Sequence, residues 1–123
     1  MSSNSGDALT IARAYHDAWW GGDFDAAGNL LAGDVAIEVP INAYNGKADF
    51  LDAVRSTRTM ATNLDLFTAL GDEHDAVLVY DMTLPIGDLR VAEHFVVDDG
   101  RIVRIRQIHD TAALRAAGFE REQ

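Results

Sequence analysis

The first hydrophobic pattern of the chain predicts an amphipathic helix that begins after Asp7 and ends near Trp20. Apolar residues recur here at spacings of three and four, which places them on one face of a helix. The Asp7 carboxylate can accept hydrogen bonds from the free amides of the first turn, and Gly21 and Gly22 end the helix. The apolar face consists of Ala8, Ile11, Ala12, Tyr15, Ala18 and Trp19.

Two further helices and one short strand are predicted in the first half of the chain. Asp23 opens a short second helix, which we expect to end at Gly33. The stretch Val35–Val39 is rich in β-forming residues and is closed by Pro40, so it predicts a strand. After a loop of turn-forming residues, Lys47–Ala61 has the spacing of a third helix.

The second half of the chain changes to the two-residue period of β-strands. Four runs are separated by three short turns, which predicts antiparallel neighbours joined as hairpins. The runs are Leu64–Leu70, Ala76–Leu84, Leu89–Val97 and Arg101–His109, and the turns are Gly71–Glu73, Pro85–Gly87 and Asp98–Gly100. A short last helix, about Thr111–Ala117, is expected to end at Gly118.

Helices followed by a strand meander are typical of an α+β domain. We expect a curved antiparallel sheet wrapped by three N-terminal helices, with a short C-terminal helix and a pocket for a small organic molecule. At 123 residues the chain should form one domain over residues 7–118, with tails at 1–6, expected to be flexible, and at 119–123.

Charge and composition exclude several classes of function. Twenty acidic and ten basic residues give a formal net charge of −10, which repels nucleic-acid phosphates and anionic membrane surfaces. Without cysteine the chain has neither disulfides nor thiolate metal sites. The first residues lack the basic start and apolar run of a signal peptide, and no apolar stretch approaches membrane-spanning length, so we expect a cytoplasmic protein.

Glu93 is the most informative residue of the alternating pattern, because it lies in the middle of an apolar row. Val91 and Phe95 continue this row on both sides. A charged carboxylate in such a position is costly unless it is paired, and burial would raise its pKa. Two interpretations remain open: an acid that donates a hydrogen bond or a proton in a pocket, and a structural acid that is paired with arginine or faces water.

In the last predicted strand, Gln107 and His109 should point inward together with Val103, because the intervening arginines favour water. Histidine is the side chain whose charge changes near neutral pH, which suits proton transfer. The alternative for His109 is a core histidine bonded to a backbone carbonyl.

Four other side chains are candidates for a site. Asp81 lies in a strand whose two rows are both apolar, which favours a homodimer interface on the outer face of the sheet. Glu38 either lines the mouth of a pocket or is solvated. Tyr15 and Trp19 lie on the buried face of the first helix, where aromatic side chains usually form core, although a buried tyrosine needs a hydrogen-bond partner.

Motifs for metals and cofactors are not evident in the sequence. The four histidines lack the spacing of a metal-binding pair on one helix. There is neither a glycine-rich phosphate loop nor a nucleophile elbow. We therefore expect no metal and no cofactor.

The order of several short motifs resembles the SnoaL-like branch of the nuclear-transport-factor-2-like, or cystatin-like, superfamily. These motifs are Ala14-Tyr15 to Ala18-Trp19, Gly22-Asp23-Phe24-Asp25, Asp34 with Glu38-Val39-Pro40, Gly46, Glu93-His94-Phe95, Asp99-Gly100-Arg101-Ile102-Val103 and Asp110. The resemblance extends from Leu9 to Leu114. It implies a cone-shaped sheet, a cavity that the first helix closes, and frequent dimerisation, on a fold that hosts many activities.

The resemblance also suggests roles for individual residues. In the ketosteroid isomerases, a helix tyrosine and a protonated strand acid form an oxyanion hole, to which Tyr15 and Glu93 correspond. Their base is an aspartate directly before a proline; here that position is Val39, and Glu38 is the neighbouring substitute. The last-strand acid of polyketide cyclases and epoxide hydrolases corresponds to Gln107, which cannot act as acid or base. The hydrolases also need an arginine two residues before the position of Asp81, where this chain has valine.

Two functional hypotheses follow. In the first, Tyr15 and Glu93 polarise a carbonyl or hydroxyl of an apolar ligand in a cofactor-independent isomerisation, cyclisation or dehydration. Either His109 or Glu38 then moves the proton. The expected substrate contacts are Trp19, Asp81, Phe95 and Gln107. In the second, the protein is a non-catalytic ligand-binding or dimerisation module, which the missing base favours.

Overall fold

The computed structural model describes residues 7–40, 44, 46–112 and 116. Three helices and five strands make up this part of the chain, in α+β order. The helices are α1 (Ala8–Trp20), α2 (Phe24–Asn29) and α3 (Lys47–Met60). The strands are β1 (Leu31–Glu38), β2 (Asn63–Gly71), β3 (Asp75–Leu84), β4 (Gly87–Asp98) and β5 (Arg101–His109).

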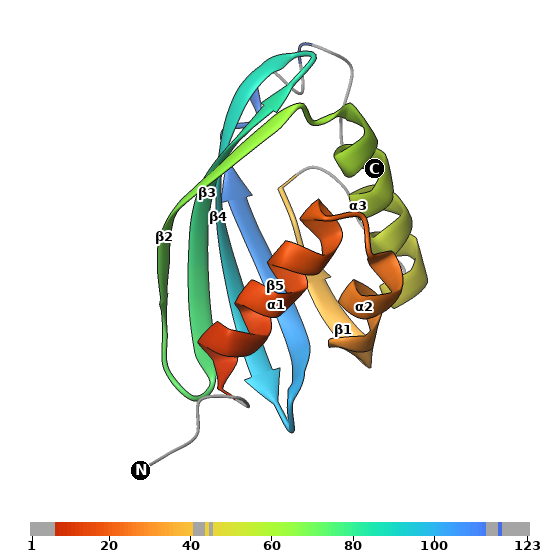
Figure 1. Ribbon diagram of the computed structural model, residues 1–123, viewed down its shortest axis with the longest axis vertical. Coiled ribbons are helices and arrows are strands. Elements are labelled where there is room, and N and C mark those ends of the chain that lie inside the picture. Colours follow the sequence, from red (N-terminus) through yellow and green to blue (C-terminus); the bar gives the residue numbers. More distant parts are fainter. Residues whose placement is uncertain (1–6, 41–43, 45, 113–115, 117–123) are drawn as a thin grey trace.

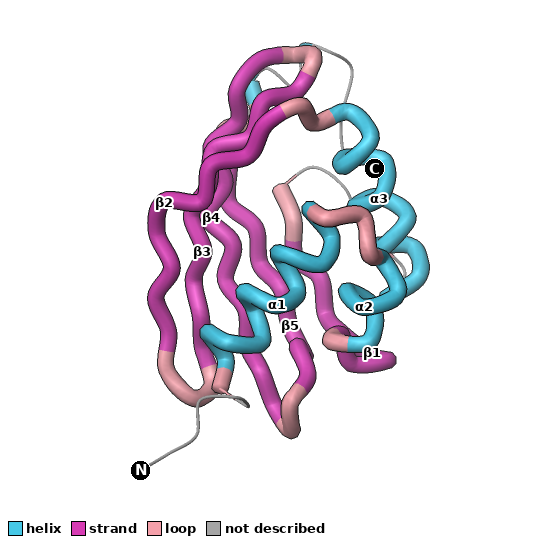
Figure 2. The backbone as a smooth tube through the Cα atoms, in the orientation of Figure 1, coloured by secondary structure: helices cyan, strands magenta, loops and turns pink. Residues whose placement is uncertain are grey.

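The strands form one curved sheet in the order β1-β5-β4-β3-β2. Strands β2 to β5 are an antiparallel meander, as predicted, whereas β1 pairs with β5 in parallel. The three helices lie on the same side of the sheet, and α1 crosses its concave face (Figure 1). Figure 2 shows how the β3–β4 hairpin bends over toward the end of α3. The predicted α+β class is therefore confirmed.

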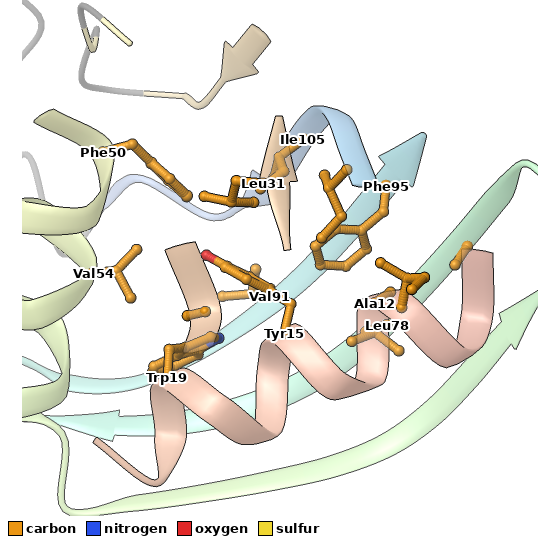
Figure 3. Packing of buried hydrophobic residues seen from close by; sticks show 14 of the residues in the cluster. Ala12, Tyr15, Trp19, Leu31, Phe50, Val54, Leu78, Val91, Phe95 and Ile105 are labelled. Atoms are coloured by element: carbon orange, nitrogen blue, oxygen red, sulfur yellow. The ribbon is translucent and has the colours of Figure 1, made fainter. Parts of the chain in front are cut away.

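Helix α1 begins and ends where the sequence predicts. The Asp7 carboxylate accepts a hydrogen bond from the Thr10 amide at 2.9 Å, and the helix is followed by Gly21. Its apolar face is buried against the sheet, with Tyr15 and Trp19 in the core (Figure 3).

The predicted end of the second helix is wrong. Helix α2 ends at Asn29, and β1 already begins at Leu31 rather than at Val35. Leu31 pairs with Ile102 of β5, and the Ile102 amide donates to the Leu30 carbonyl at 2.8 Å. Pairing with a strand 70 residues later overrides the helical spacing of these leucines, because Leu31 becomes fully buried in the core.

The phase of β5 also differs from the prediction. We expected Val103 to point inward, but Ile102 is the fully buried residue, and Val103 is only partly buried. A register shift in the β4–β5 pairing falls between Val96 and Val97, opposite this point. Such a bulge inserts one residue and reverses the alternation, so the inward row continues correctly from Ile105 onward.

The outer face of the sheet carries ion pairs among apolar side chains. The Arg90 guanidinium donates to both carboxylate oxygens of Asp81, at 2.7 and 2.9 Å. His94 bridges Asp75 and Arg106, with its ring nitrogens 2.9 and 3.3 Å from them. None of the described helices covers this face (Figure 1).

Several expectations lie outside the described residues. These are the two tails and most of the expected C-terminal helix. In the described part of the chain, no helix combines the length and the apolar character needed to cross a membrane.

His16 is an unusual member of the core. Its side chain is 3% exposed, and neither ring nitrogen has a hydrogen-bond partner among the described residues. The ring packs against Trp19 and Tyr80, with centroid distances of 5.4 and 5.0 Å. Burial lowers the pKa of His16 to about 4, so the imidazole is neutral at physiological pH.

We predict that His16→Leu stabilises the protein at pH 7 by about 1–2 kcal/mol, because leucine has no unsatisfied polar atoms. In the wild type, the folded pKa of about 4 lies below the unfolded value of 6.5. His16 therefore makes the wild type less stable as the pH falls from 6.5 to 4, and the variant lacks this loss. Urea unfolding at pH 4.5 and 7 measures both effects.

His74→Leu is the matched control, because His74 is an exposed side chain in the β2–β3 turn. It should leave the free energy of unfolding nearly unchanged. A destabilised His16→Leu protein would show that the imidazole contributes more to the core than its missing partners cost.

Candidate functional site

A cavity of about 210 Å³ lies between α1, α3 and the concave face of the sheet. Most of its wall is apolar and comes from α3 and the β3–β4 hairpin. The polar side chains that reach it are chiefly Tyr15, Tyr80, Glu93, Gln107 and His109. Such a space, mostly apolar with a few converging polar groups, is typical of a small-molecule site.

Glu93 lines this cavity from the middle of the inward row of β4. Its side chain is only 1% exposed, as the alternating pattern predicted. The Tyr80 hydroxyl donates to its Oε1 at 3.0 Å, and the Gln107 side-chain Nε2 donates to its Oε2 at 3.1 Å. Strand register produces this cluster, since Gln107 of β5 lies directly opposite Glu93.

The environment of Glu93 shifts its titration toward neutrality. Burial raises the pKa of Glu93 from 4.5 to about 7, while the hydrogen bonds from Gln107 and Tyr80 act in the opposite direction. The described residues place no arginine or lysine against this carboxyl group, so the alternative of a buried arginine pair does not apply. Both the neutral and the ionised form of Glu93 are therefore accessible near pH 7.

Tyr80 is the residue of this cluster that sequence reasoning missed. Its row on β3 was recognised as apolar, but the pattern did not show which row of that strand shares a face with Glu93. The pairing of Leu78 with Glu93 puts Tyr80, two residues further on, on the same inward face. Burial, followed by the charge of Glu93, raises the pKa of Tyr80 well above its usual value, so it stays protonated and donates.

Tyr15 lines the cavity but does not bond to Glu93 among the described contacts. Its ring packs edge-on against Phe95 at 5.9 Å, and its hydroxyl points toward the α3 side of the cavity (Figure 3). Burial, followed by the charge of Glu93, raises the pKa of Tyr15 well above its usual value. The expected Tyr15–Glu93 pair thus shares one cavity, while Tyr80 provides the hydrogen-bonded phenol.

Trp19, Gln107 and His109 also line the cavity, as expected of site residues. Trp19 forms part of the α1 wall and is 4% exposed. His109 pairs with Val91 at the end of β5 and is only partly buried, so it lies nearer to solvent than Glu93. Their roles remain predictions.

Glu38, Asp81 and Phe95 do not line the cavity. The Glu38 carboxylate bonds to Arg104 and Arg106, and these hydrogen bonds, that from Arg106 above all, lower its pKa. The hydrogen bond from its arginine partner likewise lowers the pKa of Asp81 on the outer face. Phe95 is fully buried beneath Tyr15. Alternation alone could not reveal that arginines of the last strand pair with Glu38.

Among the described residues, no group of three histidine, aspartate or glutamate side chains is placed to hold a metal ion. The hydrogen-bonding groups of the residues that line the cavity are a carboxyl, an amide, phenols and an imidazole, together with the Thr57 hydroxyl and the Trp19 indole. This set can bind an oxygen or nitrogen atom of an organic molecule and can exchange a proton with it.

Comparisons with known proteins place the chain among related folds. Residues 12–105 match the family model of the SnoaL-like domain. A crystal structure of a protein from Kribbella flavida has 32% sequence identity and a TM-score of 0.83, and the match covers 92% of this chain and 93% of that one. A search of curated proteins finds no significant match.

Two structures with isomerase names are also similar. A candidate ketosteroid isomerase from Kribbella flavida has 26% identity and a TM-score of 0.70, over 85% of this chain and 78% of its own. A steroid delta-isomerase from Pseudomonas aeruginosa has 20% identity and a TM-score of 0.75, over 91% and 88%. At this identity the latter shows the fold alone.

We predict that Glu93→Gln changes how stability depends on pH. The folded pKa of about 7 lies above the unfolded value of 4.5. The stability from the bound proton is therefore fully present below pH 4.5 and is lost as the pH rises through 7. Relative to the variant, the wild type should lose on the order of 3 kcal/mol between these limits. Urea unfolding at pH 4.5 and 8 measures the difference.

The titration of His16 is common to both proteins and cancels in this comparison. Glu73→Gln, an exposed change in the β2–β3 turn, serves as the control and should show the wild-type slope. Equal slopes for the wild type and Glu93→Gln would mean that burial does not hold a proton on Glu93.

Proposed function

The chain belongs to the SnoaL-like domain family, and on this premise we propose that it binds a small, neutral, largely apolar molecule and catalyses a cofactor-independent proton transfer on it. The reaction class is isomerisation, cyclisation or dehydration of a carbonyl or hydroxyl compound. The observation that carries this proposal is a buried acid, Glu93, held by two hydrogen bonds in the wall of a largely apolar cavity.

The size of the cavity limits the ligand. An apolar cavity of roughly 150 Å³ is enough to bind benzene. The cavity in this protein has about 210 Å³, which suits a compound of one or two rings. Its apolar walls favour the ring portion by the hydrophobic effect, and its few polar groups select one oxygen or nitrogen atom.

The polar groups divide naturally into two roles. With Glu93 protonated, the cluster of Glu93, Tyr80 and Gln107 binds the polar atom of the ligand and stabilises negative charge that develops there. Removing one such donor typically costs about 10²–10³ in kcat. Nearer to solvent, His109 accepts and returns the proton, since Glu38 is bound to two arginines outside the cavity.

The comparisons support this assignment. The Kribbella flavida structure with 26% identity is named as a candidate ketosteroid isomerase, and isomerisation is one of the reactions proposed here. We further propose a cytoplasmic location for the protein.

A second candidate function is non-catalytic ligand binding. The observation in its favour is that both Glu93 oxygens already bond to protein groups, which leaves His109 as the main proton carrier of the described cavity wall. In this case the cavity would bind the same class of ligand and release it unchanged.

The outer face of the sheet provides a surface for a second copy of the chain, and we propose a homodimer there. Phe67, Leu70 and Ile108 are 47, 66 and 70% exposed. Isolated exposed apolar residues are ordinary, but a group on an uncovered sheet face indicates an interface. The charges of this face are largely paired within the chain, so the overall net charge of −10 opposes self-association less here than elsewhere.

We expect the protein to isomerise 3-cyclohexenone to the conjugated 2-cyclohexenone, which ultraviolet absorbance follows directly. His109→Asn should lower the rate by roughly 10²–10⁴, because a positioned proton carrier contributes about this much. Asp81→Asn, on the outer face, is the control and should keep the wild-type rate. Saturable binding of 2-cyclohexenone without turnover would favour the non-catalytic function, and absence of binding would contradict both.

For the dimer, sedimentation equilibrium should give twice the monomer mass for the wild type. Ile108→Asp should give the monomer, because a charge on the contact surface must lose its hydration there. Thr10→Asp adds the same charge to the exposed side of α1 and should remain dimeric. A wild type that is monomeric at all concentrations would contradict the proposal.

A further inference from the structure

Three side chains of the cavity wall form a continuous hydrogen-bonded chain. Tyr80 and Gln107 bond to different oxygens of Glu93, at 3.0 and 3.1 Å. Glu93 is 1% exposed, whereas Gln107 is partly buried and lines the cavity. A ligand that enters therefore meets the Gln107 amide more readily than the covered carboxyl group.

The two partners of Glu93 differ in what they can do when it gains a proton. A carboxylate accepts hydrogen bonds at both oxygens, but a neutral carboxyl group must also donate one. If Tyr80 accepted this bond, its own buried hydroxyl proton would lose Glu93, its hydrogen-bond acceptor among the described residues. Such an unsatisfied donor costs about 1–3 kcal/mol.

Gln107 can accept the hydrogen bond from the protonated Glu93 carboxyl group without this cost. Its amide has a donor end and an acceptor end, which a half-turn of the amide group exchanges. With Glu93 ionised, the NH₂ end faces Glu93, as observed. With Glu93 neutral, the carbonyl end faces Glu93, and the NH₂ end is turned to the cavity.

We propose that Gln107 is the ligand-selecting residue of the cavity and presents the end of its amide that Glu93 does not use. When Glu93 is ionised, the cavity offers a carbonyl and selects hydrogen-bond donors. When Glu93 is neutral, the cavity offers an NH₂ group and selects acceptors such as ketones. This inference rests on the proposed binding of a small ligand in the cavity, but it does not require catalysis.

The other titratable groups around Glu93 do not reproduce this behaviour. Tyr15 from α1 and Tyr80 from β3 have pKa values raised well above the usual one, so both stay protonated. His16, packed against the ring of Tyr80, has a pKa of about 4. The described cavity residues of α3 carry no titratable side chain, and His109 of β5 and Tyr44 complete the titratable lining. His109 therefore needs a control.

The pKa of Glu93, about 7, sets the pH range in which the preference should change. Three bicyclic probes of similar shape separate the contributions: indole donates a hydrogen bond, 1-indanone accepts one, and indene does neither. Dissociation constants measured by calorimetry at pH 5.5 and 8.5 give the preference for each probe relative to indene. We expect the 1-indanone-to-indole affinity ratio to fall by about tenfold or more from pH 5.5 to 8.5, the factor that one hydrogen bond provides.

Two substitutions test the role of the amide. In Gln107→Leu the change in preference with pH should disappear, while binding of indene persists and thereby reports an intact cavity. In Glu93→Gln the preference should become independent of pH. In His109→Asn the change with pH should persist.

The outcomes separate this inference from the proposed function. If Gln107→Leu keeps the change in preference, the ligand contacts Glu93 directly and the inference is overturned. It is equally overturned if the wild type binds all three probes with a constant ratio, although binding itself would then stand. If none of the probes binds the wild type, the proposed ligand-binding function fails, and this inference fails with it.

Discussion

The burial of one carboxyl group, that of Glu93, constrains the rest of this structure. Strand β4 presents it inward between Val91 and Phe95, where water cannot solvate a charge. The fold compensates with two donors, Tyr80 and Gln107, from the strands on either side. Neither donor carries a charge at neutral pH. Both carboxyl oxygens therefore have hydrogen-bond partners, but no positive charge compensates the ionised form, and the pKa of Glu93 lies near 7. An arginine partner in this position would have kept it ionised and would have filled the space of the ligand.

The two faces of the sheet use their carboxylates in opposite ways. On the outer face, Glu38 and Asp81 are paired with arginines, which lower the pKa values of both. On the inner face, Glu93 has only neutral partners, and its pKa is raised. The sheet thereby separates structural charges from the acid that can change its protonation state. A site for a neutral ligand requires this separation, because a permanent charge in the cavity would have to lose its hydration whenever an apolar molecule entered.

The core contains a second titratable group with the opposite effect. Burial keeps a proton on Glu93 but removes one from His16, so the two respond to pH with opposite sign between about 4.5 and 6.5. Their contributions to the free energy of unfolding offset each other in this range. Tyr80 lies against both, with its ring on His16 and its hydroxyl on Glu93. Through Tyr80, the contact between α1 and β3 thus connects His16, whose ring nitrogens lack hydrogen-bond partners among the described residues, to the candidate site.

Local patterns in the sequence predicted α1, the four-stranded meander and the apolar row on which Glu93 lies, because a period of 3.6 or 2 is a property of neighbouring residues. They also predicted that Tyr15, Trp19, Gln107 and His109 face the interior, and all four line the cavity. The tertiary structure alone decided which groups meet: that Tyr80 bonds to Glu93, that Glu38 turns to arginines, and that β1 starts early to pair with β5. These outcomes depend on strand register and on a bulge, which join residues far apart in the chain. Alternation specifies the face of a strand on which a side chain lies, but not the partner that lies across from it.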